Sequence, residues 1–450
     1  MHNKRIPVLL AVLLLTFPTF AETFATGGPH TTNNDDSCDI ALLPAATLLL
    51  PYFEVDTRPG GETTLFTITN VTNQPQVARV TLWTDRGYMV VNFNIFLTGY
   101  DTQSINLFDI IARGIIAPDL GTGEAVSERG DFSEAGNPLV DLSACDELPG
   151  VIPNVYVQRL QKTLKEGLAP AFGNIPGCAG VGGQHENAVG YATIDVVRKC
   201  GVLAPDSPQY YEQDILWENV LTGDFQQVHS GNNYAQGNPL VHIRAVPEGG
   251  SIQQRLADPA SYTVNFERTF YGRYQSGETL DGRQPLPARF AARWISGGTG
   301  SFKTSYKIWR EGRTDGATPC DQWEVRGGKL PITEITAFDE EENPFTVAEP
   351  ICCINTRKEL PSASLSSVAN DDLYPPIPNG AVAGWMYLNL DNLENDDIAS
   401  QNWVVTSMRA EERFSTDIDA TALGNGCSPE VAQSEVYEGN DPIGPSPNGN

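Results

Sequence analysis

Short runs of alternating apolar and polar residues recur along the chain, and the clearest group spans residues 63–109. The run TLFTITNV places Phe66 and Ile68 on one side and threonines on the other. The runs VARVTLWTD and VVNFNIFLTG repeat this period of two, and a turn at residues 73–75 precedes the first of them. Such alternation over β-branched and aromatic residues predicts antiparallel strands with one packed face and one wet face.

A degenerate copy of this group follows in the second half of the chain. ARFAARWI, a turn at Gly297-Gly298, FKTSYKIWRE and EITAFD repeat the pattern. The matched positions are Phe66 with Phe290, Trp83 with Trp309, Asp85 with Glu311, Ile105 with Ile335, and Phe108-Asp109 with Phe338-Asp339. We expect a closing strand in each copy, GYATIDVV and GWMYLNLD. The pattern predicts a mainly β protein of two immunoglobulin-like antiparallel β-sandwiches related by an internal repeat, with loop and short-helix insertions.

The remaining segments are assigned by their breaks and periodicity. Pro44 and Pro51 exclude a regular helix through residues 38–56, so we expect extended edge segments there. Helical spacing predicts a helix over 155–168, starting after Pro153 and stopping at Gly167, and a second helix over 207–221. The expected organisation is a signal peptide (1–21), a flexible leader (22–37), a first sandwich (38–200, insertion 110–189), a connecting region (201–287), a second sandwich (288–427) and a disordered acidic tail (428–450).

The N-terminus has the pattern of an export signal. Lys4-Arg5 precedes an apolar run at residues 6–15, and Thr19-Phe20-Ala21 resembles a cleavage site. The run is too short to span a membrane comfortably, so we expect cleavage and secretion to the periplasm or cell exterior, with no membrane span afterwards.

The formal net charge of −27 limits the kinds of partner that we expect. A field of this sign repels phosphate backbones and anionic lipid, which argues against nucleic acid and ordinary membrane surfaces. The expected partner is an extracellular protein or a glycan.

Eight cysteines in an exported chain predict disulfides. They are Cys38, Cys145, Cys178, Cys200, Cys320, Cys352, Cys353 and Cys427. None has the C-x-x-C spacing of zinc ribbons or redox motifs. Our hypothesis pairs Cys145 with Cys178, and Cys320 with Cys352 or Cys353.

Catalytic signatures are missing from the sequence. There is no G-x-S-x-G, H-E-x-x-H, P-loop or dinucleotide-binding fingerprint. A glycosidase pair drawn from Glu218, Asp224 and Glu267, near Trp217, Phe225 and Phe266, is one alternative, and solvated acids above core aromatics are the other. A metal triad of His185, His229 and His242 competes in the same way with ordinary loop and strand histidines.

Two further segments are candidates for binding. The turn at residues 391–397 gathers Asp391, Glu394, Asp396 and Asp397, whose oxygens suit calcium, although the turn lacks the EF-hand spacing; a solvated acidic turn is the alternative. Tyr271, Arg273 and Tyr274, followed by Arg283, Arg289 and Arg293, form a basic aromatic stretch. It predicts either a recognition surface or, as we favour, an internal bridge between the two acidic sandwiches.

The hairpin TLFTITNVTNQPQVARVTLWTD resembles the opening hairpin of immunoglobulin-like modules in exported bacterial proteins. In such hairpins a strand ending in Asn meets one ending in an acidic residue, and GYATIDV and GWMYLNL look like the closing strand. The second copy departs at Trp294-Ile295-Ser296, where Asn is expected. The whole chain also resembles a group of exported bacterial proteins without an assigned activity, so the resemblance implies a fold and carries over no functional residue.

These patterns favour a secreted, non-enzymatic structural or ligand-binding protein of the cell exterior. The alternatives are a carbohydrate-active hydrolase or lyase, and a carbohydrate-binding module. We expect no cofactor other than the candidate calcium.

Overall fold

The computed structural model describes most of the N-terminal half of the chain and several separate segments of the C-terminal half. The described residues are 40–116, 129–145, 150–173, 176–205, 207–229, 231, 234–245, 269–271, 281–297, 302–311, 330–331, 334–341, 343–348, 359–360, 365–369, 381–390, 401–410 and 414–423. Within these ranges, no helix is both long and apolar enough to cross a membrane. The predicted signal peptide, leader and acidic tail lie outside the described residues.

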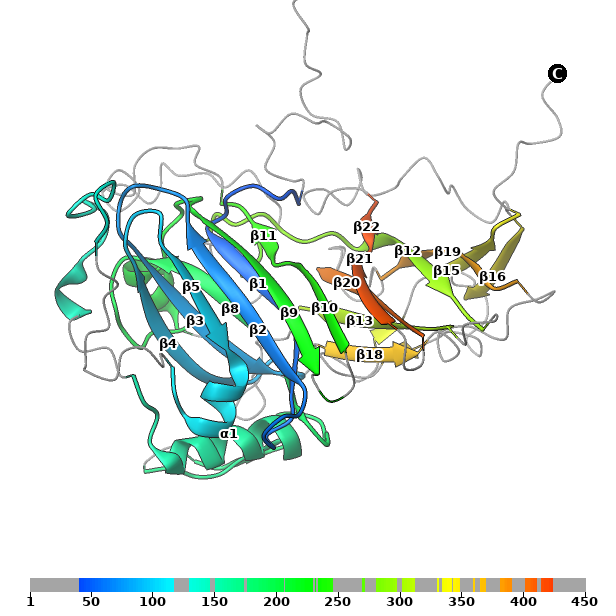
Figure 1. Ribbon diagram of the computed structural model, residues 1–450, viewed down its shortest axis with the longest axis horizontal. Helices are drawn as coiled ribbons and strands as arrows, with labels where there is room; N and C mark the ends of the chain where they lie inside the picture. The colour runs from blue at the N-terminus through cyan, green and yellow to red at the C-terminus, as the bar shows by residue number, and fades with distance from the viewer. Residues whose placement is uncertain are drawn as a thin grey trace, which may run out of the picture.

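The protein is mainly β, as predicted, and its strands pair antiparallel in several sheets (Figure 1). The N-terminal half contains β1 (Thr47–Val55), β2 (Thr63–Asn70), β3 (Gln76–Thr84), β4 (Met89–Leu97), β5 (Thr102–Asn106), β6 (Leu168–Ala169), β7 (Cys178–Ala179), β8 (Ala188–Val197), β9 (Leu221–His229), β10 (Tyr234–Pro239) and β11 (Val241–Ile243). The C-terminal half contains β12 (Arg289–Ile295), β13 (Phe302–Arg310), β14 (Leu330–Pro331), β15 (Glu334–Asp339), β16 (Pro344–Ala348), β17 (Glu359–Leu360), β18 (Leu365–Ala369), β19 (Ala383–Asn389), β20 (Asn402–Ala410), β21 (Phe414–Asp419) and β22 (Thr421–Ala422).

Each half is built on one five-stranded and one four-stranded sheet. In the N-terminal half the strand orders are β11-β1-β8-β3-β4 and β10-β9-β2-β5. In the C-terminal half they are β16-β15-β19-β12-β22 and β18-β13-β20-β21. Three strands from the expected connecting region, β9, β10 and β11, pair within the sheets of the N-terminal half.

The prediction of one wet face holds for β2 and fails for β3 and β8. In β2, buried and half-buried residues alternate along the strand. Every residue of β3 and β8 is buried, including the polar residues that the alternation assigned to water, Arg79 and Asp195 among them. The second face of these strands is covered by a short helical turn, η3 (Tyr210–Asp214), by residues 269–271 and 281–284, and by the C-terminal half.

The predicted edge segment before β2 is instead a central strand. β1 pairs with β8 on one side and with β11 on the other. Pro51 falls where the register between β1 and β8 shifts, between Leu50 and Phe53. A proline, which has no N–H for the ladder, is tolerated at such an irregularity, so it did not exclude a central position.

One of the two predicted helices is present. Helix α1 (Asn154–Glu166) follows Pro153 and ends at Gly167, whose φ of 63° suits glycine. It buries Val157, Leu160 and Leu164. The helix predicted over 207–221 is present only as a short helical stretch at residues 208–214, which includes η3. Residues 216–220 have no regular structure, and their apolar side chains are buried.

Some strand pairings are alike in the two halves. β2 pairs with β5, and β12 pairs with β19. The strands that follow β2 and β12 in the chain, β3 and β13, belong to the other sheet of each half. β3 pairs with β4 and β8, and β13 pairs with β18 and β20. The predicted matches of SINLFD with EITAFD, and of GYATIDVV with GWMYLNLD, are wrong, because β15 pairs with β19 and β16 and β19 pairs with β12.

Aromatic rings join the two halves. Tyr191 stacks on Trp83 within the N-terminal half and meets Trp309 of β13 edge-on, with 5.9 Å between the centroids in each pair. Phe270 stacks on the same Trp309 at 5.7 Å and meets Tyr271 at 4.7 Å. These five rings are buried, so the two halves share one continuous apolar core. At a second point β10 lies against β21, as Figure 1 shows.

Candidate functional site

A pocket of about 290 Å³ lies on the outer face of the sheet β10-β9-β2-β5. The register aligns one row of side chains from Ser104, Thr67 and Asp224 and a second row from Asn106, Leu65 and Gln226. Residues that alternate with these, such as Phe66, point into the core. The six residues of the two rows therefore lie on the opposite face of the sheet, which we call the outward face. All six outward residues line the pocket, whose volume is close to the lower end of the range for small-molecule sites.

The segment after β5 forms the wall of the pocket. It contains the short helical turn η1 (Asp109–Arg113), followed by Gly114 with a φ of 72°. A Cβ on Gly114 would lie 2.7 Å from Ile152 O and from a methyl group of Val157, so α1 and the wall can approach this closely only at glycine. Gln161 of α1 also donates to Ile111 O at 3.0 Å. The helix therefore holds Ile115 and Ile116 beside the sheet, where they line the pocket.

The pocket combines carboxylates, amides and hydroxyls with aliphatic side chains. Thr67 donates to Asp224 at 2.8 Å, and Asp109 forms an ion pair of 2.8 Å with Arg113. Asn106 accepts hydrogen bonds from Thr63 and from the backbone N–H of Phe108. The polar side chains are therefore held in position before any ligand arrives.

The predicted glycosidase residues are only partly brought to this pocket. Asp224 lies in it, and Glu218 does not line it. Phe225 and Trp217 are buried, so neither is a stacking platform for a sugar, and burial raises the pKa of Glu218. Glu267 and Phe266 lie outside the described residues. The second carboxylate of the pocket, Asp109, was missed because only the fold of η1 brings it beside β9.

The three histidines of the hypothetical metal triad do not converge. His185 lies 2.9 Å from Asp85, and His242 is buried with its Nδ1 2.8 Å from Leu43 O. Across the part of the chain that the structure describes, no three His, Cys, Asp or Glu side chains gather as they would around a metal ion. The calcium candidates Asp391, Glu394, Asp396 and Asp397 lie outside the described residues, so that hypothesis stays a prediction.

The predicted recognition residue Tyr271 is in the core, which corrects the surface interpretation. Its side chain is 1% exposed, and its hydroxyl donates to Asp195 at 2.9 Å. Arg273 and Tyr274 lie outside the described residues. Arg283, from the same basic stretch, is buried, but its partners belong to the N-terminal half and to its own segment, so the internal bridge between the two sandwiches stays a prediction. It donates to Thr47 and to Leu216 O, and it forms an ion pair with Asp281 at 3.1 Å.

Asp195 is the centre of this buried polar layer. Thr47 and Tyr210 donate to it at 2.5 and 2.6 Å, in addition to Tyr271. Burial raises the pKa of Asp195, and the charge of Arg283 and the hydroxyl donors only partly oppose this. These groups bind each other beneath the surface, so they are not available to a substrate in solution.

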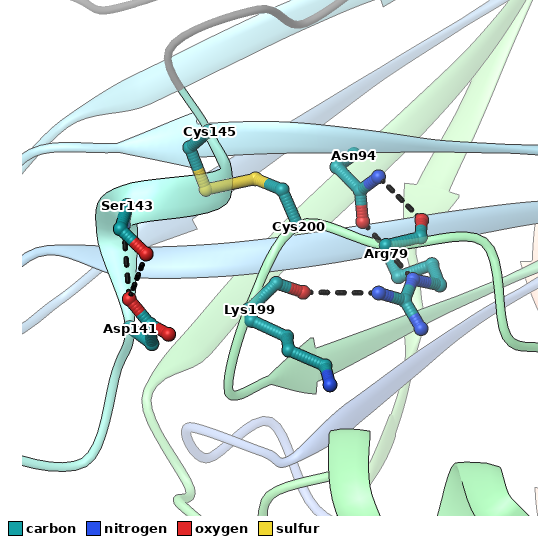
Figure 2. The surroundings of a disulfide bond; sticks show 8 residues. Arg79, Asn94, Asp141, Ser143, Cys145, Lys199 and Cys200 are labelled. Atoms are coloured by element: carbon teal, nitrogen blue, oxygen red, sulfur yellow. Dashed lines mark hydrogen bonds between the residues drawn. A yellow bond between two sulfur atoms is a disulfide. The ribbon is translucent and has the colours of Figure 1, made fainter.

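Arg79, one partner of a second buried ion pair, lies near a disulfide bond (Figure 2). Arg79 of β3 and Asp214 of η3 are 2.6 Å apart with fully buried side chains. The same guanidinium donates to Asn94 Oδ1, Lys199 O and Leu203 O. This pair fastens residues 207–220, which we call the cover segment, to the five-stranded sheet of the N-terminal half.

The predicted pairing of Cys145 with Cys178 is wrong. Cys145 is bonded to Cys200, and Cys178 is itself disulfide-bonded. Cys200 follows β8 in the chain and lies beside the segment that contains Cys145, as Figure 2 shows. Sequence spacing did not indicate this proximity. Cys38, Cys320, Cys352, Cys353 and Cys427 lie outside the described residues.

Charged groups also meet where β1 faces the C-terminal half. Lys307 of β13 places its ammonium 4.2 Å from the ring centre of Tyr52, whose hydroxyl donates to Glu54 at 2.5 Å. Burial lowers the pKa of Lys307. Burial, aided by the charge of Glu54, raises the pKa of Glu62 to about 7, and burial raises that of Asp417 to about 6. Glu62 and Asp417 therefore hold their protons to a higher pH than exposed carboxyl groups do.

No protein family, curated protein or solved structure matches the chain. Any functional assignment therefore rests on the residues of this chain alone.

Proposed function

We propose that the protein is an exported, non-enzymatic β-sandwich protein that binds a hydroxyl-rich ligand, such as a glycan segment, in the pocket beside β2. The observation that carries this proposal is the double row of outward side chains across β5, β2 and β9. Carboxylates and amides at such spacing offer acceptors and donors for neighbouring hydroxyl groups. Leu65, Ile115 and Ile116 add an apolar surface for the carbon skeleton of the ligand.

Export is supported by two independent features. The N-terminal sequence has the pattern of a signal peptide. The Cys145–Cys200 disulfide is of a kind that persists in oxidising compartments and is rare in the cytosol.

The architecture that we propose is a duplicated immunoglobulin-like sandwich. In the N-terminal half β2 of one sheet is followed by β3 of the other sheet, and in the C-terminal half β12 is followed by β13 in the same way. Each of these four strands has two antiparallel neighbours. Trp83 and Trp309 are both buried near the ends of β3 and β13, and a buried tryptophan is one hallmark of such modules. Phe66 and Phe290 are both buried as well.

A glycoside hydrolase is the second candidate, because Asp109 and Asp224 line the same pocket. Such an enzyme needs two carboxyl groups on either side of the scissile bond. The two functions differ in a simple way: a hydrolase releases reducing ends, and a binding protein does not.

The test uses the mature protein on a glycan array, followed by a reducing-sugar assay with the glycans that bind. We expect binding without release, and a loss of affinity of about tenfold to a hundredfold for Asp224→Asn, because a hydrogen bond to a charged group is removed. Thr69→Val is the matched control, since Thr69 lies on the same sheet face, bonded to Thr102, outside the pocket. Release of reducing sugar would favour the hydrolase, and the absence of any bound glycan would contradict the proposal.

A further inference from the structure

Three loops that hydrogen-bond to one another at one end of the N-terminal half each expose a large apolar side chain. Val71 follows β2, Tyr100 lies between β4 and β5, and Phe132 belongs to the loop 130–137. Their exposed fractions are 38%, 60% and 86%. Single exposed apolar residues are common, but three on adjoining loops are not, and such a group marks an interaction site. We call Val71, Tyr100 and Phe132 the tip surface.

Hydrogen bonds between the loops hold the tip surface together. Tyr100 N donates to Thr72 O at 2.8 Å, Ser133 Oγ donates to Gly99 O at 2.7 Å, and Glu134 N donates to Asn73 O at 2.7 Å. Each of these bonds involves a residue of the tip surface or a residue within two positions of one. A Cβ on Gly99 would lie 2.2 Å from Asn73 O, so these two loops touch backbone to backbone.

Two buried asparagines strengthen this arrangement. Asn70 donates to Gln74 O and Thr98 O, and its Oδ1 accepts from Thr72. Asn137 donates to Pro75 O at 3.0 Å. The loops are thus cross-linked in the way that pre-organised binding loops are, which lowers the entropy that binding costs.

The backbone of Tyr100 is the second sign of a role in binding. Its φ is 60°, and among the described residues no other non-glycine residue has a positive φ. A left-handed conformation is unfavourable for a residue with a Cβ, and such strain clusters at functional sites. Glycine would relieve it, yet the chain places an exposed tyrosine there.

The charges around the tip surface indicate the kind of partner. Asp101, Asp131 and Glu134 lie on the same loops, against one cation, Arg129. Anionic lipid and a second copy of this chain, which carries a formal net charge of −27, would both be repelled. An apolar centre with an acidic border matches a partner with an apolar patch bordered by lysine and arginine.

We propose that the tip surface is a docking site for a basic protein segment, with Tyr100 and Phe132 as its anchors. The site is distinct from the pocket. β2 and β5 run antiparallel, and the tip surface lies at the end where Thr69 and Thr102 meet, whereas the pocket lies towards the end where Leu65 and Asn106 meet.

The test is a selection of random twelve-residue peptides displayed on phage against the mature protein. We expect the enriched peptides to combine aromatic or aliphatic residues with lysine or arginine. Their affinity should fall about tenfold or more with Phe132→Ser or Tyr100→Ser, as anchor residues require, and should fall with Asp131→Lys and with added salt.

Val202→Ser is the matched control, because Val202 is 83% exposed and lies outside the tip surface. Its peptide affinity should equal that of the unmodified protein, and circular dichroism melting should show that all variants remain folded. Failure to enrich any peptide, or peptides that bind Phe132→Ser equally well, would overturn the proposal. Vesicles with one third phosphatidylserine form the second arm, and Phe132-dependent binding to them would assign the tip surface to a membrane instead.

Discussion

Replacing Asp214 by asparagine tests whether the buried ion pair with Arg79 holds the cover segment on the five-stranded sheet. Both side chains are fully buried and their charged atoms are 2.6 Å apart. Asp214→Asn preserves the size of the side chain and removes its charge. The Arg79 guanidinium would then remain buried with only neutral acceptors, namely Asn94 Oδ1, Lys199 O and Leu203 O.

Removing one partner of a buried pair typically costs about 3–5 kcal/mol, because the remaining charge cannot return to water. A loss of about 4 kcal/mol corresponds to a roughly thousandfold smaller ratio of folded to unfolded chain. The same change at an exposed pair costs under about 1 kcal/mol. Arg113→Gln is therefore the control, since Arg113 pairs with Asp109 and its side chain is 58% exposed.

The measurement is urea unfolding followed by tryptophan fluorescence, with Arg79→Met, Asp214→Leu as a third variant. This double variant removes both charges, so we expect it to be more stable than Asp214→Asn. A loss below about 1 kcal/mol for Asp214→Asn would refute the reasoning. The same conclusion would follow if the double variant were no more stable than the single one.

Three other predictions follow from the geometry. Replacing Cys145 and Cys200 by serine should lower the free energy of unfolding by about 4 kcal/mol, since the disulfide bond spans 55 residues. Non-reducing peptide mapping should recover the Cys145–Cys200 pair, and a linked Cys145–Cys178 peptide would contradict it. Because burial raises the pKa of Glu62 from 4.5 to about 7, the folded chain binds the Glu62 proton more tightly than the unfolded chain. The contribution of Glu62 to the free energy of unfolding should therefore fall by ~3 kcal/mol as the pH rises through that interval. In urea titrations at several pH values, Glu62→Gln should reduce this loss of stability, and Glu186→Gln, whose side chain is 85% exposed in the native protein, should leave it unchanged. Trp309→Ala should lower the free energy of unfolding by about 3–5 kcal/mol. It should also split the unfolding of the two halves into two calorimetric transitions, because Trp309 contacts Tyr191 and Phe270. One unchanged transition would contradict this role of Trp309 and show that the halves are coupled elsewhere.

The candidate site could be predicted only in part. Asp224 was a candidate from its sequence neighbourhood, but Asp109 is far from it in the chain and joins it only through the pairing of β2 with both β5 and β9. Tyr271 was a surface candidate because aromatic and basic residues together favour recognition, and burial beside Asp195 gave it another role. Sequence composition does not indicate which polar residues find partners inside the protein.

The sequence alone determined the local structure: strands where apolar residues alternate, and α1 between Pro153 and Gly167, because period and capping act between residues a few positions apart. The tertiary structure determined which faces of the strands are buried. Arg79 and Asp195 alternate like residues of a solvent-exposed face, and they are buried because η3 and the segments around Tyr271 and Arg283 cover them. Their partners stand up to 148 positions away along the chain, and no local pattern carries information about contacts at that separation.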